Sequence, residues 1–345
     1  MMDILKEVDF RKELKSTPRT GYLFFGDEDY LKTFAVKQAR ELLCPDPSFA
    51  FFNEMKLDAV DFDPQKLLDA LMPMPMMADR KLITLTGLNF NTMRQSDLDA
   101  LCEVLSLLTE YDYNLLIVVA SAESLAPGYL PKRPSAALKK LGEHLTPVHF
   151  ERCTTAKLAA WVQKHFSHNG VTASDTFCMR FPEYCGHSMY LLANEIDKLS
   201  YYVLSHGRTD VTDEDMRLVC TSTDEYDAFA MTNAVMEGRP EEALAILADY
   251  RFRRVEPTII SAEISRTICD MLAVRTMTGE GTPATEIASV LDLKSEFKVK
   301  LYQKALRSVS EERLRRALDA CLDVDRLLKN SPNGYDPLEK LICQL

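Results

Sequence analysis

Residues 22–32 read YLFFGDEDYLK, and the change of pattern within them decides the fold. Four apolar or aromatic residues, Tyr22–Phe25, predict a short buried strand, and Gly26 predicts a tight turn directly after it. Beyond the turn, apolar residues recur at the spacing of a helix: Leu31, Phe34, Ala35, Ala39 and Leu42. A strand, a glycine turn and a helix in this order are typical of the place where α/β proteins bind a phosphate group.

The residues of this turn do not suit a phosphate. A Walker A loop uses a second glycine, a lysine for the phosphate charge and a hydroxyl for Mg²⁺. This turn has one glycine, no lysine within it and no Ser or Thr before Thr33. Asp27, Glu28 and Asp29 instead occupy the first helical turn, where carboxylates cap free amides and repel a triphosphate. We expect a helix capped by its own acidic residues and closed to ATP.

Other catalytic devices are also missing from the sequence. Residues 80–90, RKLITLTGLNF, offer Thr84, Thr86 and Gly87 where a Walker B strand ends in an acid that holds Mg²⁺. There is no G-x-S-x-G or H-E-x-x-H motif, and none of the six histidines is paired with a nucleophile at a readable spacing. We expect no nucleotide hydrolysis, no catalytic residue and no bound cofactor.

Length, composition and charge limit the class of protein. The chain has 345 residues, 46% hydrophobic and 27% charged, and single cores rarely exceed about 250–300 residues, so we expect two or three domains. It has no apolar run of about 18 residues and no signal-peptide pattern at its start, which predicts a cytoplasmic protein without a membrane partner. A net charge of −11 argues against a chain that grips nucleic acid mainly by itself.

The nine cysteines form no C-x-x-C pair. Cys178 and Cys185, with His187 nearby, come closest to a metal-binding cluster, but their spacing is not that of a zinc site. We expect no metal site and interpret the cysteines as buried free thiols of a protein in a reducing compartment.

Strands and helices alternate over residues 1–149, which predicts an α/β domain with a doubly wound parallel sheet. The run LLIVVA at 115–120 is apolar throughout, as expected of a parallel strand that is covered on both faces. Residues 127–135, PGYLPKRPS, predict a loop. The expected strands are Tyr22–Phe25, Phe52–Leu57, Lys81–Leu85, Leu115–Ala120 and Val148–Phe150.

After residue 149 the strand pattern ends and helices follow. Residues 153–170, 189–204 and 211–220 predict a small helical domain over 150–219, in which Thr154 or Thr155 and Thr212 act as helix caps. Longer apolar stripes, interrupted at 238–240, 279–283 and 330–337, predict a third, all-helical domain over 220–345.

The stretch LMPMPMMADRK at 71–81 contains a methionine-rich segment, residues 72–77, which we call the methionine loop. Pro73 and Pro75 prevent a continuous helix. One interpretation is that the methionines cover the core of the domain. The other is that Met74, Met76 and Met77 form an exposed apolar knob that enters a pocket of a partner, because methionine adapts to irregular grooves.

Taken in order, these stretches resemble the delta subunit family of the bacterial DNA polymerase III clamp loader over nearly the whole chain. YLFFGDEDYLK is similar to the opening strand and helix of that family, and MPMPMMADRKLITL is similar to its clamp-binding element. The later stretches LLIVVAS, AWVQKHFSHNGVTAS, LLANEIDKLSYY and TSTDEYDAFAMTNAVMEGRPEEALAIL resemble the frame of the following domains and the start of the collar.

The resemblance implies an AAA+-like domain without a working nucleotide site, a helical lid domain and a helical collar. It implies a subunit that binds the sliding clamp (beta) and holds one of its interfaces open for loading onto primed DNA. Its other partners would be the loader subunits delta-prime and tau/gamma, contacted through the collar. The clamp contacts of the family fall on Met74, Met76 and Met77, where this sequence has methionine in place of the usual Leu-Phe.

Two other functions fit the residues: a hydrolase with a degenerate phosphate loop, or an AAA+-shaped adaptor of a different assembly. Two basic groups also have two interpretations, since each can contact DNA or a neighbouring collar, or belong to a solvated helix face. These groups are Arg251, Arg253 and Arg254, and Arg313, Arg315 and Arg316.

Overall fold

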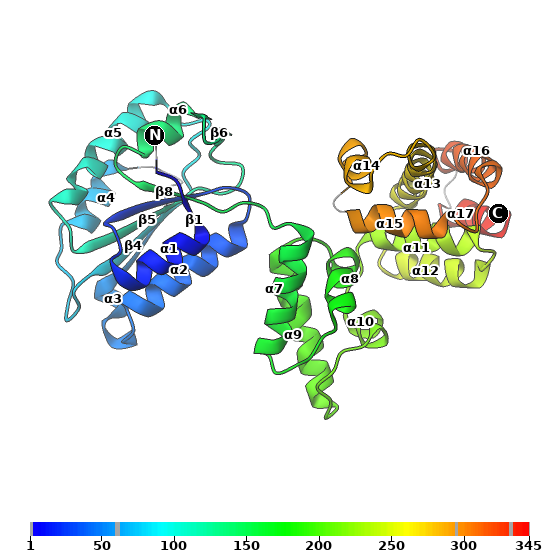
Figure 1. Ribbon diagram of the computed structural model, residues 1–345, viewed down its shortest axis with the longest axis horizontal. Helices are drawn as coiled ribbons and strands as arrows, with labels where there is room; N and C mark the ends of the chain where they lie inside the picture. The colour runs from blue at the N-terminus through cyan, green and yellow to red at the C-terminus, as the bar shows by residue number, and fades with distance from the viewer. Residues whose placement is uncertain (1–2, 59–62, 294–295, 331–333, 345) are drawn as a thin grey trace. The chain divides into compact units, whose positions relative to one another are not determined.

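The computed structural model describes residues 3–58, 63–293, 296–330 and 334–344 (Figure 1). Internal contacts divide the chain into two compact units, residues 1–153 and residues 154–345. The first is an α/β unit and the second is helical. The three-domain division at 149/150 and 219/220 stays a prediction.

The α/β unit is built on a parallel sheet, as the sequence predicts. Its order from one edge to the other is β1-β8-β2-β5-β4-β3, and every neighbouring pair is parallel. The edge strand β1 is missing from the prediction because two residues carry no readable periodicity. In chain order the strands are β1 (Leu5–Lys6), β2 (Gly21–Phe25), β3 (Glu54–Asp58), β4 (Lys81–Thr86), β5 (Asn114–Val119) and β8 (Thr146–His149).

Helices cover both faces of this sheet (Figure 1). One face carries α1 (Glu7–Ser16) and α2 (Asp29–Leu43); Phe10 of α1 meets Tyr22 and Phe24 of β2 edge-on, and α2 contacts β4. On the other face Leu23 and Phe25 join a core with α4 (Pro64–Leu71), α5 (Gln95–Ser106) and α6 (Ala136–Leu141). All residues of β2 are buried, which is why the strand is apolar on both sides.

Short elements complete the unit. A 3₁₀ turn, η1 (Pro47–Phe49), leads into α3 (Ala50–Asn53), and η2 (Leu107–Thr109) follows α5. The predicted loop at 127–135 holds a minimal hairpin of β6 (Gly128–Tyr129) and β7 (Arg133–Pro134).

The helical unit begins with α7 (Thr155–His168), α8 (Asp175–Cys185), α9 (Met189–Ser205) and α10 (Asp213–Val219). Thr154 caps α7 through the amide of Lys157. Thr212 and Asp215 form a reciprocal capping box on α10. These caps confirm the predicted helix starts, because each side chain satisfies an amide that has no partner within its helix.

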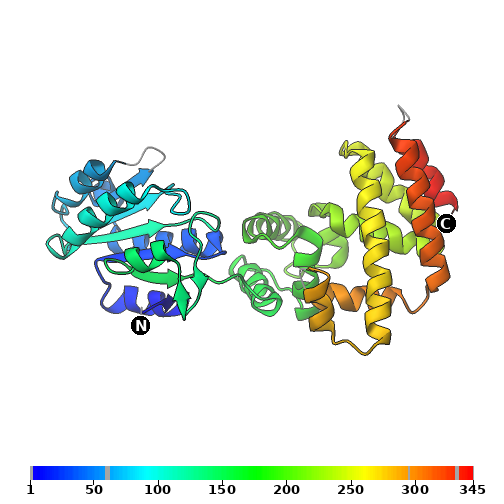
Figure 2. The ribbon, with the colours of Figure 1, turned by 90° about the horizontal axis from the view of Figure 1, so that it is seen from above.

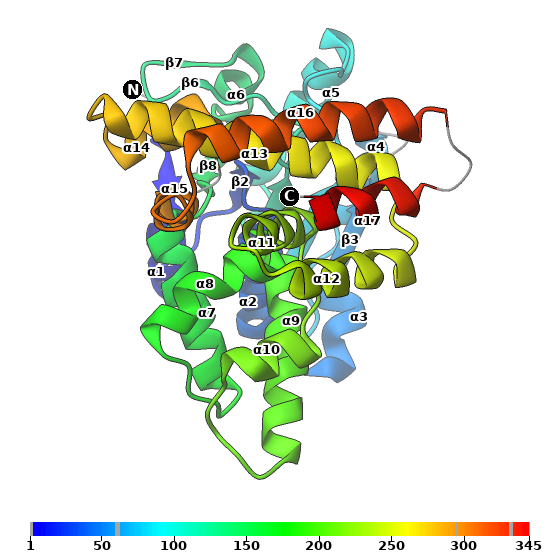
Figure 3. The ribbon, with the colours of Figure 1, turned by 90° about the vertical axis from the view of Figure 1, so that its right-hand side faces the viewer.

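The remaining helices enclose a hydrophobic core of their own. The long helices α13 and α16 lie side by side in this group (Figures 2 and 3). Within the described residues, no helix is both long and apolar enough to cross a bilayer. The helices are α11 (Asp224–Met236), α12 (Pro240–Phe252), α13 (Pro257–Gly279), α14 (Ala284–Val290), α15 (Glu296–Ala305), α16 (Glu311–Leu328) and α17 (Tyr335–Gln344).

Candidate functional site

The turn after β2 is closed by a buried lysine. The Lys32 side chain is fully buried, and its ammonium donates to the carbonyls of Gly26 at 2.8 Å and Ala120 at 2.6 Å. It also pairs with the Asp29 carboxylate at 2.6 Å. Gly26 and Ala120 follow the carboxyl ends of the adjacent strands β2 and β5, the edge at which parallel sheets bind ligands. In this protein an internal cation occupies that position.

The expected capping of α2 by its own carboxylates is wrong for Glu28. Glu28 is the cap residue, but its side chain makes no capping hydrogen bond. Burial raises the pKa of its carboxyl group, and one carboxylate oxygen lies 3.5 Å from the amide of Cys153. Asp29 of this acidic turn therefore serves as the partner of Lys32.

Sequence reasoning passed over a signal at this turn. GDEDYLKT, residues 26–33, places Lys32 and Thr33 at the Walker A offsets from Gly26, with Leu31 in place of the second glycine. The helix starts at Asp29, so the chain is already helical where a Walker loop would wrap around phosphate. Lys32 consequently points inward from the first turns of α2 instead of toward a ligand.

Gly26 explains why the turn stays tight. Its φ of 110° belongs to a region that side chains rarely adopt. A Cβ atom at this position would lie 2.4 Å from the carbonyl oxygen of Phe150. The strand–glycine–helix turn is thus retained as a packing feature of the α/β unit.

The methionine loop lies between α4 and β4, at the opposite end of the sheet, where the parallel strands begin. Its side chains point to solvent: Met74 is 77% exposed, Met76 45% and Met77 82%. Met77 has a φ of 53°, which is uncommon for a residue other than glycine. The interpretation of these methionines as a cover for the core therefore does not hold for Met74 and Met77.

The backbone of the loop is held by side chains from other elements. Asn53 is almost completely buried, and its amide group both donates to the Met76 carbonyl and accepts from the Met76 amide, each at 2.7 Å. The Tyr113 hydroxyl donates to the Met72 carbonyl at 2.6 Å. Asn114 donates to the Leu71 carbonyl at 3.1 Å. The loop is thus fixed through its main chain and leaves its methionine side chains unengaged.

Lys81 is the charged member of this support. Its buried ammonium donates to the carbonyl of Ala70 at 2.6 Å and to that of Pro73. These carbonyls lie at and just beyond the carboxyl end of α4, where the helix dipole favours a cation. Burial lowers the pKa of Lys81 to about 8.

This pKa predicts a pH-dependent contribution to stability. In the unfolded chain a lysine has a pKa of about 10.4, so between about pH 8 and pH 10 the unfolded state binds more protons. The free energy of unfolding should therefore rise with pH in this interval. Below it both states are protonated, and the full cost of burying the ammonium is present.

The measurement is urea unfolding across this interval, compared between the wild type and Lys81→Met. The variant should lack the Lys81 part of the rise. Lys66→Met, which removes an exposed lysine from α4, should retain it. Equal slopes in the wild type and Lys81→Met would contradict the assignment.

Phe51 and Phe52 lie beside the loop and were not identified from the sequence. Phe51 and Phe52 come just before β3, and the methionine loop comes just before β4. Because β3 and β4 are neighbouring parallel strands, both segments lie at the same end of the sheet, where its strands begin. Phe51 is 86% exposed and Phe52 50%, with their rings edge-to-face. The predicted strand Phe52–Leu57 is wrong at its start, because Phe52 belongs to α3 and β3 begins at Glu54.

Together these residues form an exposed apolar surface at one edge of the α/β unit. We call it the Met–Phe surface and define it as Phe51, Phe52, Met74, Met76 and Met77. The hydrogen bonds of Asn53, which follows Phe52, to Met76 join its two parts. Clustered exposed apolar side chains of this kind mark interaction sites.

Arginines considered for DNA contact make local interactions. Arg251 pairs with Glu339, Arg253 with Asp227 and Asp249, and Arg315 with Glu311. Arg313 donates to the carbonyl of Val235. These pairings favour the interpretation as helix faces of the helical unit.

All nine cysteines are free. The expectation that they are buried is wrong for Cys269 and Cys343, which are exposed.

Family models of known proteins match both units of the chain. Residues 22–150 match the family model "DNA polymerase III, delta subunit", and residues 225–342 match "DNA polymerase III delta subunit, C-terminal domain". The chain belongs to the DNA polymerase III delta subunit family. The two matches cover the α/β unit from β2 to β8 and the helices from α11 onward.

Two relatives of this delta-family chain span almost its full length. DNA polymerase III subunit delta of Bacillus subtilis is 26% identical over 331 residues, 93% of this chain and 90% of the relative. The solved structure of the Bacillus subtilis DNA clamp loader delta protein (YqeN) covers 98% of both chains at 20% identity, with a TM-score of 0.59. The fold is thus a parallel α/β unit followed by helices, as predicted, and the YqeN structure shares it.

Proposed function

We propose that this chain is the clamp-loader subunit that binds the sliding clamp (beta) and helps open it for loading onto primed DNA, without hydrolysing ATP itself. The observation that carries the proposal is the Met–Phe surface, an exposed apolar group on a backbone fixed by Asn53, Lys81 and Tyr113. A pre-formed apolar tip loses little conformational entropy on binding. It therefore suits a partner that offers an apolar pocket.

The closed turn at Gly26 supports the second half of the proposal. Lys32 is committed to two backbone carbonyls and to Asp29, so it is not available to a phosphate. We infer that energy from ATP enters through other subunits. In this proposal those partners are delta-prime and tau/gamma, contacted through the helices of 220–345 in the cytoplasm, and DNA is contacted only within the assembly.

The test uses the purified full-length chain with the sliding clamp of the same organism. A complex should form without nucleotide, and calorimetric titration of the chain with Mg-ATP should give no heat of binding. Binding of ATP would favour a degenerate hydrolase. Absence of a complex, with recovery of a different assembly from native extract, would favour an adaptor.

The aromatic part of the surface gives a separate prediction. Phe51→Ser with Phe52→Ser, with all methionines intact, should lower clamp affinity by about tenfold or more, because buried aromatic anchors often contribute above 1–2 kcal/mol. Surface plasmon resonance on immobilised clamp measures this change. Phe252→Ser is the matched control, since Phe252 is also 86% exposed but lies on α12. Equal clamp affinities of the two variants would show that Phe51 and Phe52 do not contribute to clamp binding.

A further inference from the structure

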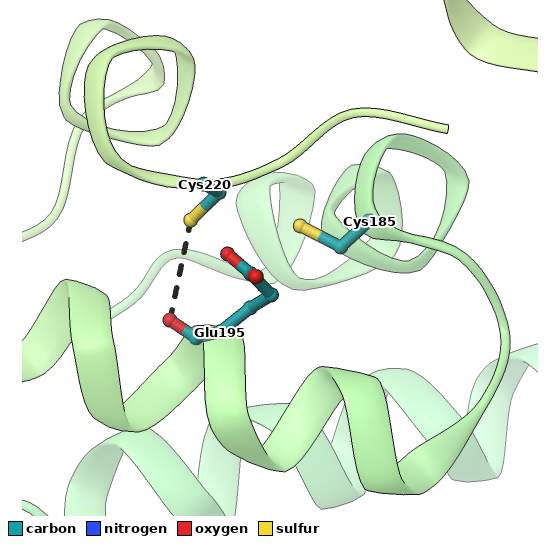
Figure 4. A group of neighbouring side chains, drawn as sticks. All are labelled: Cys185, Glu195 and Cys220. Atoms are coloured by element: carbon teal, nitrogen blue, oxygen red, sulfur yellow. Dashed lines mark hydrogen bonds between the residues drawn. The ribbon is translucent and has the colours of Figure 1, made fainter. Parts of the chain in front are cut away.

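Three potential metal ligands meet in the helical unit (Figure 4). Cys185 is the last residue of α8, Glu195 lies on α9, and Cys220 follows α10. Their ligand atoms, two sulfurs and a carboxylate oxygen, all lie within 4.8 Å of one another. Within the described part of the chain, these are the three histidine, cysteine or acidic side chains whose ligand atoms lie close enough together to hold one metal ion.

The three side chains of the group lie inside the helical unit, with Glu195 partly buried. Both cysteines are buried, and the Cys220 thiol lies 4.0 Å from the backbone carbonyl of Glu195. The Glu195 carboxylate accepts from the amide of Thr221 at 3.1 Å and pairs with Lys198 at 2.7 Å. A ligand oriented by a hydrogen bond from the backbone is a common feature of metal sites.

We propose that Cys185, Glu195 and Cys220 bind a zinc ion, with a water molecule as the fourth ligand. Zinc prefers thiolate, imidazole and carboxylate ligands in tetrahedral geometry, and two sulfurs select it over magnesium or calcium. Binding releases the two thiol protons to solvent. Two thiolates and one carboxylate around Zn²⁺ give the site a net charge of −1, which the Lys198 ammonium balances.

The site explains a feature of the chain path. Cys220 stands between α10 and α11, where the polypeptide leaves the group α7–α10. A zinc ion would link this segment to the end of α8 and to the middle of α9. It would therefore fix the exit of the chain from this group without a disulfide. The ligands are separated by ten and 25 residues, so their spacing gave no sign of a site and only the fold brings them together.

The experiment uses reduced, metal-free, full-length protein titrated with Co²⁺, whose thiolate complexes absorb in the near ultraviolet. The wild type should develop this absorption and lose it when Zn²⁺ is added. Cys185→Ser and Cys220→Ser should each weaken Zn²⁺ affinity by about 100-fold or more, because loss of an outer partner alone costs about 10–100-fold. Cys178→Ser, which changes a buried cysteine of α8 outside the group, should bind as the wild type does.

A second measurement needs no variant. Zn²⁺ should protect two thiols of the wild type from alkylation, and mass spectrometry should identify them as Cys185 and Cys220. The proposal is overturned if no thiolate absorption develops, if it persists in both serine variants, or if Zn²⁺ protects other cysteines. The readouts do not involve the clamp, so the result is independent of the proposed function.

Discussion

Met76→Ala combined with Met77→Ala should abolish detectable clamp binding while the thermal stability of the chain hardly changes. Met77 is 82% exposed and Met76 45%, so only part of one side chain is removed from buried area in the free protein. On binding, each buried methionine contributes about 1.5–3 kcal/mol. Together they account for at least a 100-fold change in affinity, since about 1.4 kcal/mol corresponds to a factor of ten.

Binding to immobilised clamp and thermal melting of the free chain measure the two halves of this prediction. Tyr129→Ala is the control, because Tyr129 is 83% exposed on the same unit but belongs to the β6–β7 hairpin. A large loss of thermal stability with clamp affinity retained would show that the methionines cover the core of the α/β unit. Affinity retained without any loss of stability would place the clamp contact elsewhere.

Lys32→Met should destabilise the α/β unit by about 3 kcal/mol. The substitution leaves the carbonyls of Gly26 and Ala120 without their buried donor, and an unsatisfied buried group costs about 1–3 kcal/mol. It also leaves Asp29 without its partner. Because Asp29 is 45% exposed, water compensates for part of that loss and the total stays near the lower end for a broken buried pair, about 3–5 kcal/mol.

The position of the single tryptophan makes this measurement specific. Trp161 lies on α7 of the helical unit, so its fluorescence follows the unfolding of that unit, whereas circular dichroism follows both. Lys32→Met should shift the urea transition seen by circular dichroism. Lys37→Met, an exposed position on the same helix, should not. An unchanged transition in Lys32→Met would show that the buried ammonium is not a stabilising group.

Much of the fold was predictable because buried parallel strands are apolar on both faces. Short apolar runs were enough to find β2, β4, β5 and β8. Thr154 and Thr212 marked helix starts, because their side chains can cap a free backbone amide. What failed was local. The two residues of β1 are too few for a pattern, and Phe52 is strand-like in composition but belongs to α3, which ends at Asn53, the residue that binds the Met76 backbone.

The candidate site was predictable in position but not in construction. The prolines and methionines of residues 72–77 indicated an irregular apolar segment, and the structure shows it exposed. Its supports were not predictable, since Asn53 and Tyr113 are 23 and 41 residues away from the carbonyls they bind. In the same way, no spacing rule shows that the Lys32 side chain of α2 binds the carbonyls that follow β2 and β5.

The hydrogen bonds that shape the methionine loop come from Asn53, Lys81, Tyr113 and Asn114, and none of them uses a methionine side chain. If the proposed function holds, folding and recognition are therefore encoded by separate sets of residues. The tip can accept leucine or phenylalanine in place of methionine without any refolding, so its grip on a partner can be retuned by exchange of side chains alone. Any comparison restricted to the contacting residues would overlook the amide and ammonium groups that give the loop its form.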